Sequence, residues 1–320
     1  MLLKRRLKNQ ATLRLRQFAE VAQRFGWNIT PDHFYADMPK FRTLRTDSYW
    51  CRGFPVDGIP GMDLDSQRRV LEEWMSGYME ELGSTDVYRE ACQRNGEAGY
   101  GPIECQLLHA FVRKNRPGKI VQVGCGVSTA VILGAAEREG GYQPEVVCVE
   151  PFPTGFLEEE GKAGRIRLVR EGAQKVDLEV LASIPEGGLL FVDSTHTTHV
   201  GSEVNRLILE VLPALGPGVY VHFHDIFIPY DYHPAIMRDL LFFGRESTLL
   251  HAFLLHNERY RVSVSQYMLN VFDQETMRRF FPGYRARPLV EGVFATTEPT
   301  YGAQTPEKGY YPSAIYIRRH

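Results

Sequence analysis

The sequence predicts an α/β fold in which helices cover both faces of a parallel sheet. From residue 118 onward, short apolar runs alternate with segments of helical spacing, and the runs are mostly hydrophobic, as strands buried on both faces are. The predicted strands are 119–123, 145–150, 165–169, 189–193 and 219–223.

The segments between these strands predict helices at roughly 128–138, 173–182 and 201–212. The third of them carries an apolar stripe that should face the core, formed by Val200, Val204, Leu207, Ile208 and Val211. Two further helices are expected near 234–242 and 247–256. Residues 261–265 and 313–317 alternate in side-chain character and should pair as strands at an edge of the sheet.

Residues 1–99 are expected to form a helical and loop-rich N-terminal extension, followed by the α/β domain at 100–320. Residues 1–25 mix basic and apolar positions, which predicts one or two amphipathic helices, and residues 66–82 have the spacing of a helix with one buried face. We interpret the extension as a lid or as the contact of a homo-oligomer. Contact of its basic helices with an acidic membrane surface is the alternative.

Composition restricts the classes of partner and compartment. The chain carries 37 Lys or Arg and 39 Asp or Glu, so a nucleic-acid partner is not expected, although residues 1–24 hold seven basic residues and one Glu. No apolar run reaches the length of a membrane span, and no secretory signal is expected at the N-terminus. The five scattered cysteines form no CxxC pair, which favours buried free thiols and a reducing, cytoplasmic location.

The first two strands end in residues that suit a nucleoside-bearing cofactor. The first runs into Gly124, Gly126 and Ser128, where glycines permit a tight turn and the following helix N-terminus attracts negative charge. The second ends at Glu150, whose carboxylate can accept hydrogen bonds from both hydroxyls of a ribose. Thr129 stands where a dinucleotide fingerprint has its third glycine, so NAD is less favoured.

Histidines and aspartates follow the fourth and fifth strands. Asp193 and His196 close the fourth strand, and His224 and Asp225 close the fifth. Because neighbouring parallel strands end at the same edge of a sheet, we expect these groups to converge there. A histidine could then remove a proton from a substrate hydroxyl, or Asp193, His224 and Asp225 could bind a divalent cation.

Taken in order, these segments resemble class I S-adenosylmethionine (SAM)-dependent methyltransferases. More narrowly, they resemble a bacterial subfamily of small-molecule and sugar-type O-methyltransferases, whose members share four short segments. The corresponding segments here are the glycine turn 123–129, Val149-Glu150-Pro151, Asp193-Ser194-Thr195-His196 and His222-Phe223-His224-Asp225-Ile226-Phe227.

The resemblance implies a Rossmann-like seven-stranded sheet with an antiparallel last strand, and methyl transfer from SAM to a small-molecule or sugar-type hydroxyl. It implies that Gly124, Gly126 and Ser128 hold the methionine part of SAM, that Glu150 holds the ribose, and that Asp193 lies between cofactor and acceptor. His196, His224 and Asp225 would act as base, orienting group or metal ligands. The family usually has an acid where this chain has Gln122, which leaves the usual contact with the methionine amino group open.

Two other classes of function remain open from the sequence. One is a metal-dependent SAM enzyme that uses Asp193, His224 and Asp225 as ligands, where the imidazole weakly favours a transition metal over magnesium. The other is a non-catalytic SAM-binding module, which the loss of the acid at Gln122 would fit.

Overall fold

The computed structural model describes residues 14–30, 32, 34–36, 38–46, 50, 52–232, 237, 242–285, 289–290, 293–294 and 312–320. The chain divides into two compact units, Met1–Thr46 and Asp47–His320. This division differs from the boundary expected at residue 99. None of the helices in the described residues is long and apolar enough to cross a membrane.

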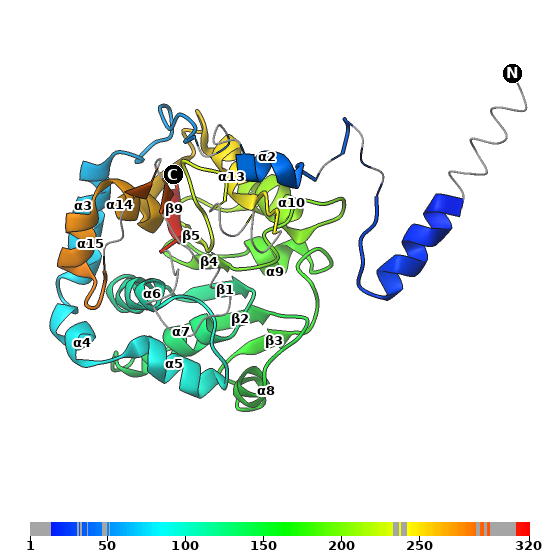
Figure 1. Cartoon of the computed structure of the whole chain (residues 1–320). Coiled ribbons are helices and arrows are strands. Elements are labelled where there is room, and N and C mark those ends of the chain that lie inside the picture. The colour runs from blue at the N-terminus through cyan, green and yellow to red at the C-terminus, as the bar shows by residue number, and fades with distance from the viewer. Residues whose placement is uncertain are drawn as a thin grey trace, which may run out of the picture. The chain divides into compact units, whose positions relative to one another are not determined.

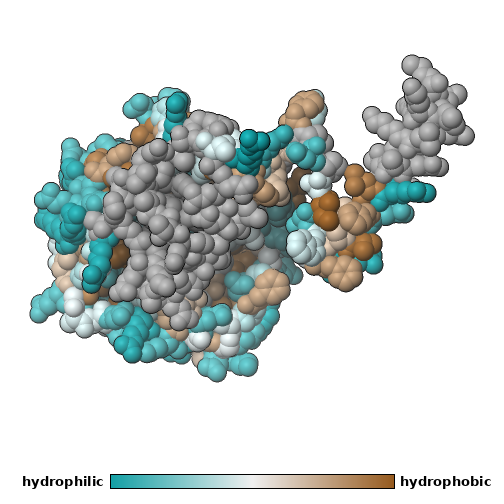
Figure 2. All heavy atoms as spheres, viewed as in Figure 1, coloured by the Kyte–Doolittle hydropathy of each residue, from teal (hydrophilic) through white to brown (hydrophobic). Residues whose placement is uncertain are grey.

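In the first unit, residues 14–24 are helical and α2 spans Phe41–Thr46. The helix expected within 1–25 is therefore present over 14–24, and residues 1–13 lie outside the described part of the chain. Its apolar side chains Leu15, Phe18 and Val21 are 41%, 55% and 50% exposed, and Figure 2 shows brown, apolar atoms on this helix. An apolar face of this kind suits a helix that packs against a partner.

The second unit is built on a seven-stranded sheet with the order β3-β2-β1-β4-β5-β9-β6 (Figure 1). The first five strands in the chain are parallel, and β9 runs antiparallel to both of its neighbours. This confirms the Rossmann-like sheet with an antiparallel last strand. The strands are β1 (Lys119–Val123), β2 (Glu145–Val149), β3 (Arg167–Val169), β4 (Leu189–Val192), β5 (Tyr220–Phe223), β6 (Tyr260–Ser265) and β9 (Ile315–Arg319).

The strand order reverses between β1 and β4, because the chain winds outward to β2 and β3 before returning to β4 beside β1. In an open sheet, this switch point leaves a crevice outside the carboxyl ends of the two strands. The predicted edge pair is also present: β6 lies at the edge, and β9 lies inside the sheet between β5 and β6.

Helices cover both faces of the sheet (Figure 1). One face packs against α3 (Leu64–Met75), α5 (Val87–Asn95), α6 (Pro102–Asn115), α7 (Val127–Glu137), α14 (Gln266–Phe272) and α15 (Gln274–Phe280). The other packs against α9 (Leu178–Ala182), α10 (Glu203–Arg206), the π-helical turn η2 (Leu207–Val211), α11 (Leu212–Ala214) and α13 (Glu246–Leu254). The remaining elements are α4 (Met79–Ser84), α8 (Gly155–Lys162) and the two short strands β7 (Leu289–Val290) and β8 (Val293–Phe294).

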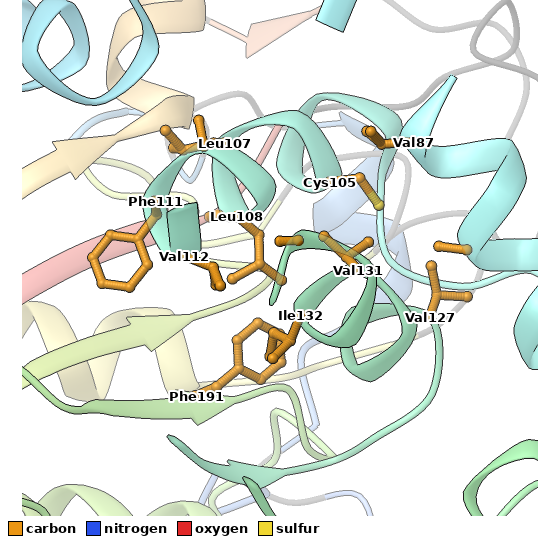
Figure 3. Packing of buried hydrophobic residues seen from close by; sticks show 14 of the residues in the cluster. Val87, Cys105, Leu107, Leu108, Phe111, Val112, Val127, Val131, Ile132 and Phe191 are labelled. Atoms are coloured by element: carbon orange, nitrogen blue, oxygen red, sulfur yellow. The ribbon is translucent and has the colours of Figure 1, made fainter. Parts of the chain in front are cut away.

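Successive side chains along each strand point to opposite faces of the sheet, so the sheet has a hydrophobic core on each face. Ile120 of β1 faces the first helical layer, whereas Val121 and Val123 face the second. Figure 3 shows part of the first core, where side chains of α6 and α7 lie together with Phe191 of β4.

The helices of residues 64–115 belong to the sheet unit rather than to a separate extension. Trp74 of α3 is 2% exposed, and its ring packs edge-on against Phe111 of α6 and Tyr316 of β9, with centroids 4.9 and 5.4 Å apart. The expected single helix at 66–82 is two helices, α3 and α4, separated by a turn that contains Gly77.

Two other helix predictions differ from the structure. The stripe at 201–212 is buried except for Val200, which precedes the N-cap residue Ser202 and is fully exposed. The helix expected at 173–182 starts only at Leu178, because Arg206 donates hydrogen bonds to the carbonyls of Ala173 and Val176. Most of the expected helix at 234–242 lies outside the described residues.

Removing residues 1–46 is expected to leave the sheet unit stable, whereas removing residues 1–64 should destabilise it. The longer deletion takes away Ile59 and Met62, which are 5% and 4% exposed, and the Pro60 carbonyl that accepts from the amide of Val262 in edge strand β6. Losing two buried apolar side chains should lower the free energy of unfolding by at least about 3 kcal/mol. Urea unfolding of both truncated proteins measures the difference, and equal midpoints would contradict it.

Candidate functional site

The turn after β1 brings the ends of β1 and β4 into close contact. Gly124 has φ of 81°, and a Cβ at this position would lie 1.7 Å from the carbonyl oxygen of Asp193. The amide of Asp193 donates to the carbonyl of Val123 at 2.8 Å, which holds the two strand ends together. Only glycine fits this position, because any side chain would displace the backbone of Asp193.

Gln122 fixes the first turn of α7. Its amide Nε2 donates to Ser128 Oγ at 3.1 Å, and its Oε1 accepts from Thr129 Oγ1 at 2.8 Å. Thr129 Oγ1 in turn accepts from the amide of Gly126 at 3.2 Å, and all of these groups are buried. Gln122 thus uses both ends of its side chain to hold the glycine turn against the helix.

Glu150 lies against the same turn. Its carboxylate accepts from the amide of Cys125 at 3.2 Å and from the amide of Phe152 at 2.9 Å. A carboxylate has about four acceptor positions, so those that remain can receive further donors. The structure therefore places three of the predicted cofactor residues, Gly124, Gly126 and Glu150, around one turn, with Ser128 at the start of the helix that follows.

Asp193, His196 and His224 form a compact group beyond the ends of β4 and β5. Asp193 Oδ1 lies 3.2 Å from His224 Nδ1 and 3.5 Å from His196 Nε2. One ligand atom from each of the three lies within 4.8 Å of the other two. His196 has a positive φ of 59°, an uncommon conformation for a residue other than glycine and one found at functional sites.

Asp225 lies beside this group and not within it. Its Oδ1 accepts from Ser313 Oγ at 2.9 Å, and its Oδ2 is 3.7 Å from His196 Nε2. The sequence predicts Asp193, His224 and Asp225 as metal ligands; in the structure, the closest group is Asp193, His196 and His224, and Asp225 lies at its edge. The reason is the left-handed backbone of Asp225, with φ of 52°, together with the hydroxyl of Ser313 that holds its carboxylate.

Two glutamates that the sequence analysis did not identify complete the cluster. Glu246, in the first turn of α13, accepts from His196 Nδ1 at 2.7 Å. Glu104 of α6 has Oε1 3.9 Å from His224 Nε2 and accepts from the amide of Ser313 at 2.9 Å. The only sequence signal for Glu104 is that a single acid interrupts the apolar helix 102–112.

The carboxylates decide the charge of the two histidines. Burial lowers the pKa of His224, but Asp225 and Asp193 raise it, so that it reaches about 9. Burial also opposes the charged form of His196, and hydrogen bonds with Asp193 and Glu246 nevertheless raise its pKa well above the ordinary value. The carboxylates therefore favour the protonated form of both imidazoles in the metal-free protein.

Burial and the neighbouring charges also shift the pKa values of the acidic residues in the cluster. Burial raises the pKa of Glu104 to about 7 and also raises the pKa of Glu246. For Asp193, burial is outweighed by His224 and His196, which lower its pKa. The site is thus a group of carboxylates, two buried and two partly exposed, whose negative charge the two histidines partly balance when protonated.

Residues 121–226 match a family model described as a methyltransferase domain. This part of the chain is thus similar to a methyltransferase domain, and the match includes the glycine turn, Glu150, Asp193 and His224. The chain is 22% identical to an uncharacterized protein of Archaeoglobus fulgidus over 174 aligned residues. The alignment covers 52% of this chain and 78% of that protein.

Three solved methyltransferase structures are similar to the chain. They are SAH-bound PaMTH1 of Podospora anserina (14% identity, TM-score 0.41, 92% of this chain and 99% of that one), TomG of Streptomyces achromogenes in complex with SAM (14%, 0.42, 78% and 98%) and an O-methyltransferase of Bacillus cereus in complex with SAH (13%, 0.42, 78% and 100%). These likenesses are too distant to support a conclusion about this chain.

Proposed function

We propose that the methyltransferase domain uses SAM and transfers its methyl group to a hydroxyl oxygen of a small molecule or sugar. The observation that carries the proposal is the position of Glu150. Two backbone amides fix its carboxylate beside the glycine turn, at the switch point of the sheet, where a ribose diol can donate to its remaining acceptor positions.

The residues around the turn support separate parts of the cofactor. Gly124, Gly126 and Ser128 would hold the methionine part near the N-terminus of α7, and Asp193 would lie between cofactor and acceptor. SAM supplies a methyl group that its sulfonium already makes reactive. The chain's own tasks are then to align the acceptor oxygen with that methyl group and to remove the acceptor's proton.

Replacing Glu150 by alanine is expected to weaken SAM binding by ~1–3 kcal/mol, the range for a charge-assisted hydrogen bond. Titration calorimetry of both proteins measures the change. Glu145→Ala is the matched control, because Glu145 starts the same strand at its opposite, exposed end. Equal losses in both variants, or no loss in Glu150→Ala, would contradict the proposed ribose contact.

Proton removal has two candidate routes at the same cluster. In the first, His224 or His196 accepts the substrate proton, with Asp193 or Asp225 orienting the imidazole. Because the neighbouring carboxylates favour the protonated form of both imidazoles, this route requires one of them to lose that proton first. Only the neutral fraction could act as base.

In the second route, Asp193, His196 and His224 would hold a divalent cation, and two of their three donor pairs lie at distances that suit one. Two donors bonded at about 2.0–2.2 Å to a tetrahedral or octahedral ion lie roughly 2.8–3.6 Å apart, and the structure has pairs at 3.2 and 3.5 Å. A bound cation would lower the pKa of a substrate hydroxyl. Its binding would displace the imidazole protons, because only neutral histidine is a ligand.

We also propose that the N-terminal unit serves as a lid or as the contact of a homo-oligomer, on the basis of its basic charge and its exposed apolar helix face. The protein lacking residues 1–46 should then lose turnover or change its oligomeric state. Light scattering and rate measurements on the truncated protein distinguish the two. If the truncated protein keeps the oligomeric state and the full rate of the full-length protein, both roles are excluded.

A further inference from the structure

Each histidine of the cluster has a buried glutamate on the side away from Asp193. His196 directs Nε2 toward Asp193 and Nδ1 toward Glu246, at 3.5 and 2.7 Å. His224 directs Nδ1 toward Asp193 at 3.2 Å, and its Nε2 lies 3.9 Å from Glu104 Oε1 and 3.8 Å from Asp225 Oδ1, both beyond direct hydrogen-bond distance. The two imidazoles therefore lie between a central aspartate and two outer glutamates.

The burial of the two outer glutamates, Glu104 and Glu246, is unfavourable for the stability of the fold. Both side chains have 0% exposure. Glu104 Oε2 and Glu246 Oε1 have no hydrogen-bond partner among the described residues. Burying a carboxylate without full pairing is unfavourable, so these two positions are not explained by stability alone.

The backbone reinforces the contact between His196 and Glu246. The amides of Arg245 and Glu246, at the start of α13, both donate to the carbonyl of His196, at 2.9 and 3.3 Å. The left-handed residue His196 is therefore attached to the same helical turn through its main chain and its imidazole. This double attachment fixes the direction of Nε2.

We infer that Glu246 and Glu104 are positioning residues that hold His196 Nε2 and His224 Nδ1 toward a transition-metal ion bound together with Asp193. Metal-binding histidines usually donate their other N–H to a carboxylate, which fixes the tautomer and the ring orientation and raises the basicity of the ligand nitrogen. Two imidazole donors favour a transition metal over Mg²⁺, which prefers oxygen ligands. The inference rests on the metal route of the proposed function.

Zn²⁺ and Mg²⁺ titrations of the chelator-treated full-length protein, at one pH and without SAM, test this inference. The wild type should bind Zn²⁺ at one site, at least about 100-fold more tightly than Mg²⁺. Glu246→Gln and Glu104→Gln keep the side-chain volume but lose the charge, so each should weaken Zn²⁺ binding about tenfold. The alanine variants should weaken it by up to about 100-fold.

Glu160→Ala is the matched control, because Glu160 is also buried but lies in α8, where it pairs with Arg165 and Arg94. The Zn²⁺ affinity of this variant should equal that of the wild type. A wild type that binds no Zn²⁺, or glutamine variants with unchanged affinity, would overturn the inference. The same proteins are titrated with S-adenosylhomocysteine. If the protein binds S-adenosylhomocysteine but not Zn²⁺, the inference is wrong and the proposed cofactor stands. If it binds Zn²⁺ but not S-adenosylhomocysteine, the proposed cofactor is wrong and the metal site stands.

Discussion

Replacing His224 by alanine is expected to lower turnover by ~10²–10⁴-fold while SAM affinity changes little. His224 contacts the carboxylate of Asp193, whereas Glu150 holds the glycine turn through the amide of Cys125, so the loss of His224 should affect the acceptor's proton and leave the contacts of Glu150 in place. His196→Ala should act in the same direction, because its imidazole faces the same aspartate. Rates and SAM titrations of each variant provide the measurement.

The pH profile and a chelator distinguish the two routes. If His224 is the base, the rate should rise as the pH increases through about 9, where its imidazole becomes neutral, and not near the ordinary value of about 6.5. If a metal is held there, a chelator should reproduce the His224→Ala loss in the unmutated protein, and the rise should lie at lower pH because the metal displaces the proton. A chelator without effect excludes the second route.

The raised pKa of His224 also predicts how the stability of the fold changes with pH. A group whose pKa is higher in the folded than in the unfolded protein stabilises the fold fully below the unfolded value, here about 6.5. That contribution is lost as the pH rises through about 9. The free energy of unfolding of the metal-free protein should therefore decrease over this range, and less so in His224→Ala.

The control for these variants is His109→Ala. His109, in α6, is 1% exposed and donates a hydrogen bond at 2.9 Å to Glu81 of α4, which is not a residue of the cluster. Its loss should lower stability without the specific loss of rate. Normal turnover in stably folded His224→Ala and His196→Ala, insensitive to chelator, would leave the cluster without a part in the reaction.

Gly124→Ala should abolish the cofactor site and weaken the fold. The added Cβ would stand 1.7 Å from the Asp193 carbonyl oxygen, and the residue would keep a left-handed φ. The left-handed conformation alone costs roughly 1–2 kcal/mol, so with the backbone displacement we expect a loss of at least about 2 kcal/mol in the free energy of unfolding. SAM affinity should fall by at least about tenfold, as measured by calorimetry.

Gly134→Ala is the matched control in the same βα unit. A Cβ at Gly134 meets nothing within 4 Å, and the residue is inside α7, where alanine is the better helix former. This variant should be as stable as the wild type or more stable, with unchanged SAM affinity. If Gly124→Ala bound SAM like Gly134→Ala, the close approach of β1 and β4 would not matter for the site.

Local patterns predicted the sheet well because its central strands are buried on both faces and are therefore continuously apolar. β1 was predicted with its observed bounds, and β2, β4 and β5 to within one residue at either end. β3 is shorter than predicted, since only Arg167–Val169 pairs with β2. The helix 102–115 was not predicted, because α6 is buried on nearly all sides and lacks the stripe that marks a surface helix. The helix 87–95 was not predicted either; only Val87, Ala91 and Asn95 of it are buried.

The candidate site was predictable in part for the same reason. Residues that close neighbouring strands must meet, so Asp193 and His224 could be placed together before the structure was known. Glu246 and Glu104 could not, because they lie 50 residues from His196 and 120 from His224 in sequence, on helices whose packing no local pattern reveals. The role of Gln122 also depended on the contact of a strand with the next helix.

The central claim is that the turn at Gly124–Ser128 and the carboxylate of Glu150 together bind SAM. Calorimetric titration of the full-length protein with SAM, S-adenosylhomocysteine and NAD⁺ tests it most directly. The account predicts that SAM and S-adenosylhomocysteine bind with dissociation constants on the order of micromolar, near −8 kcal/mol, and that NAD⁺ does not bind. Binding of NAD⁺ with no binding of SAM would contradict it.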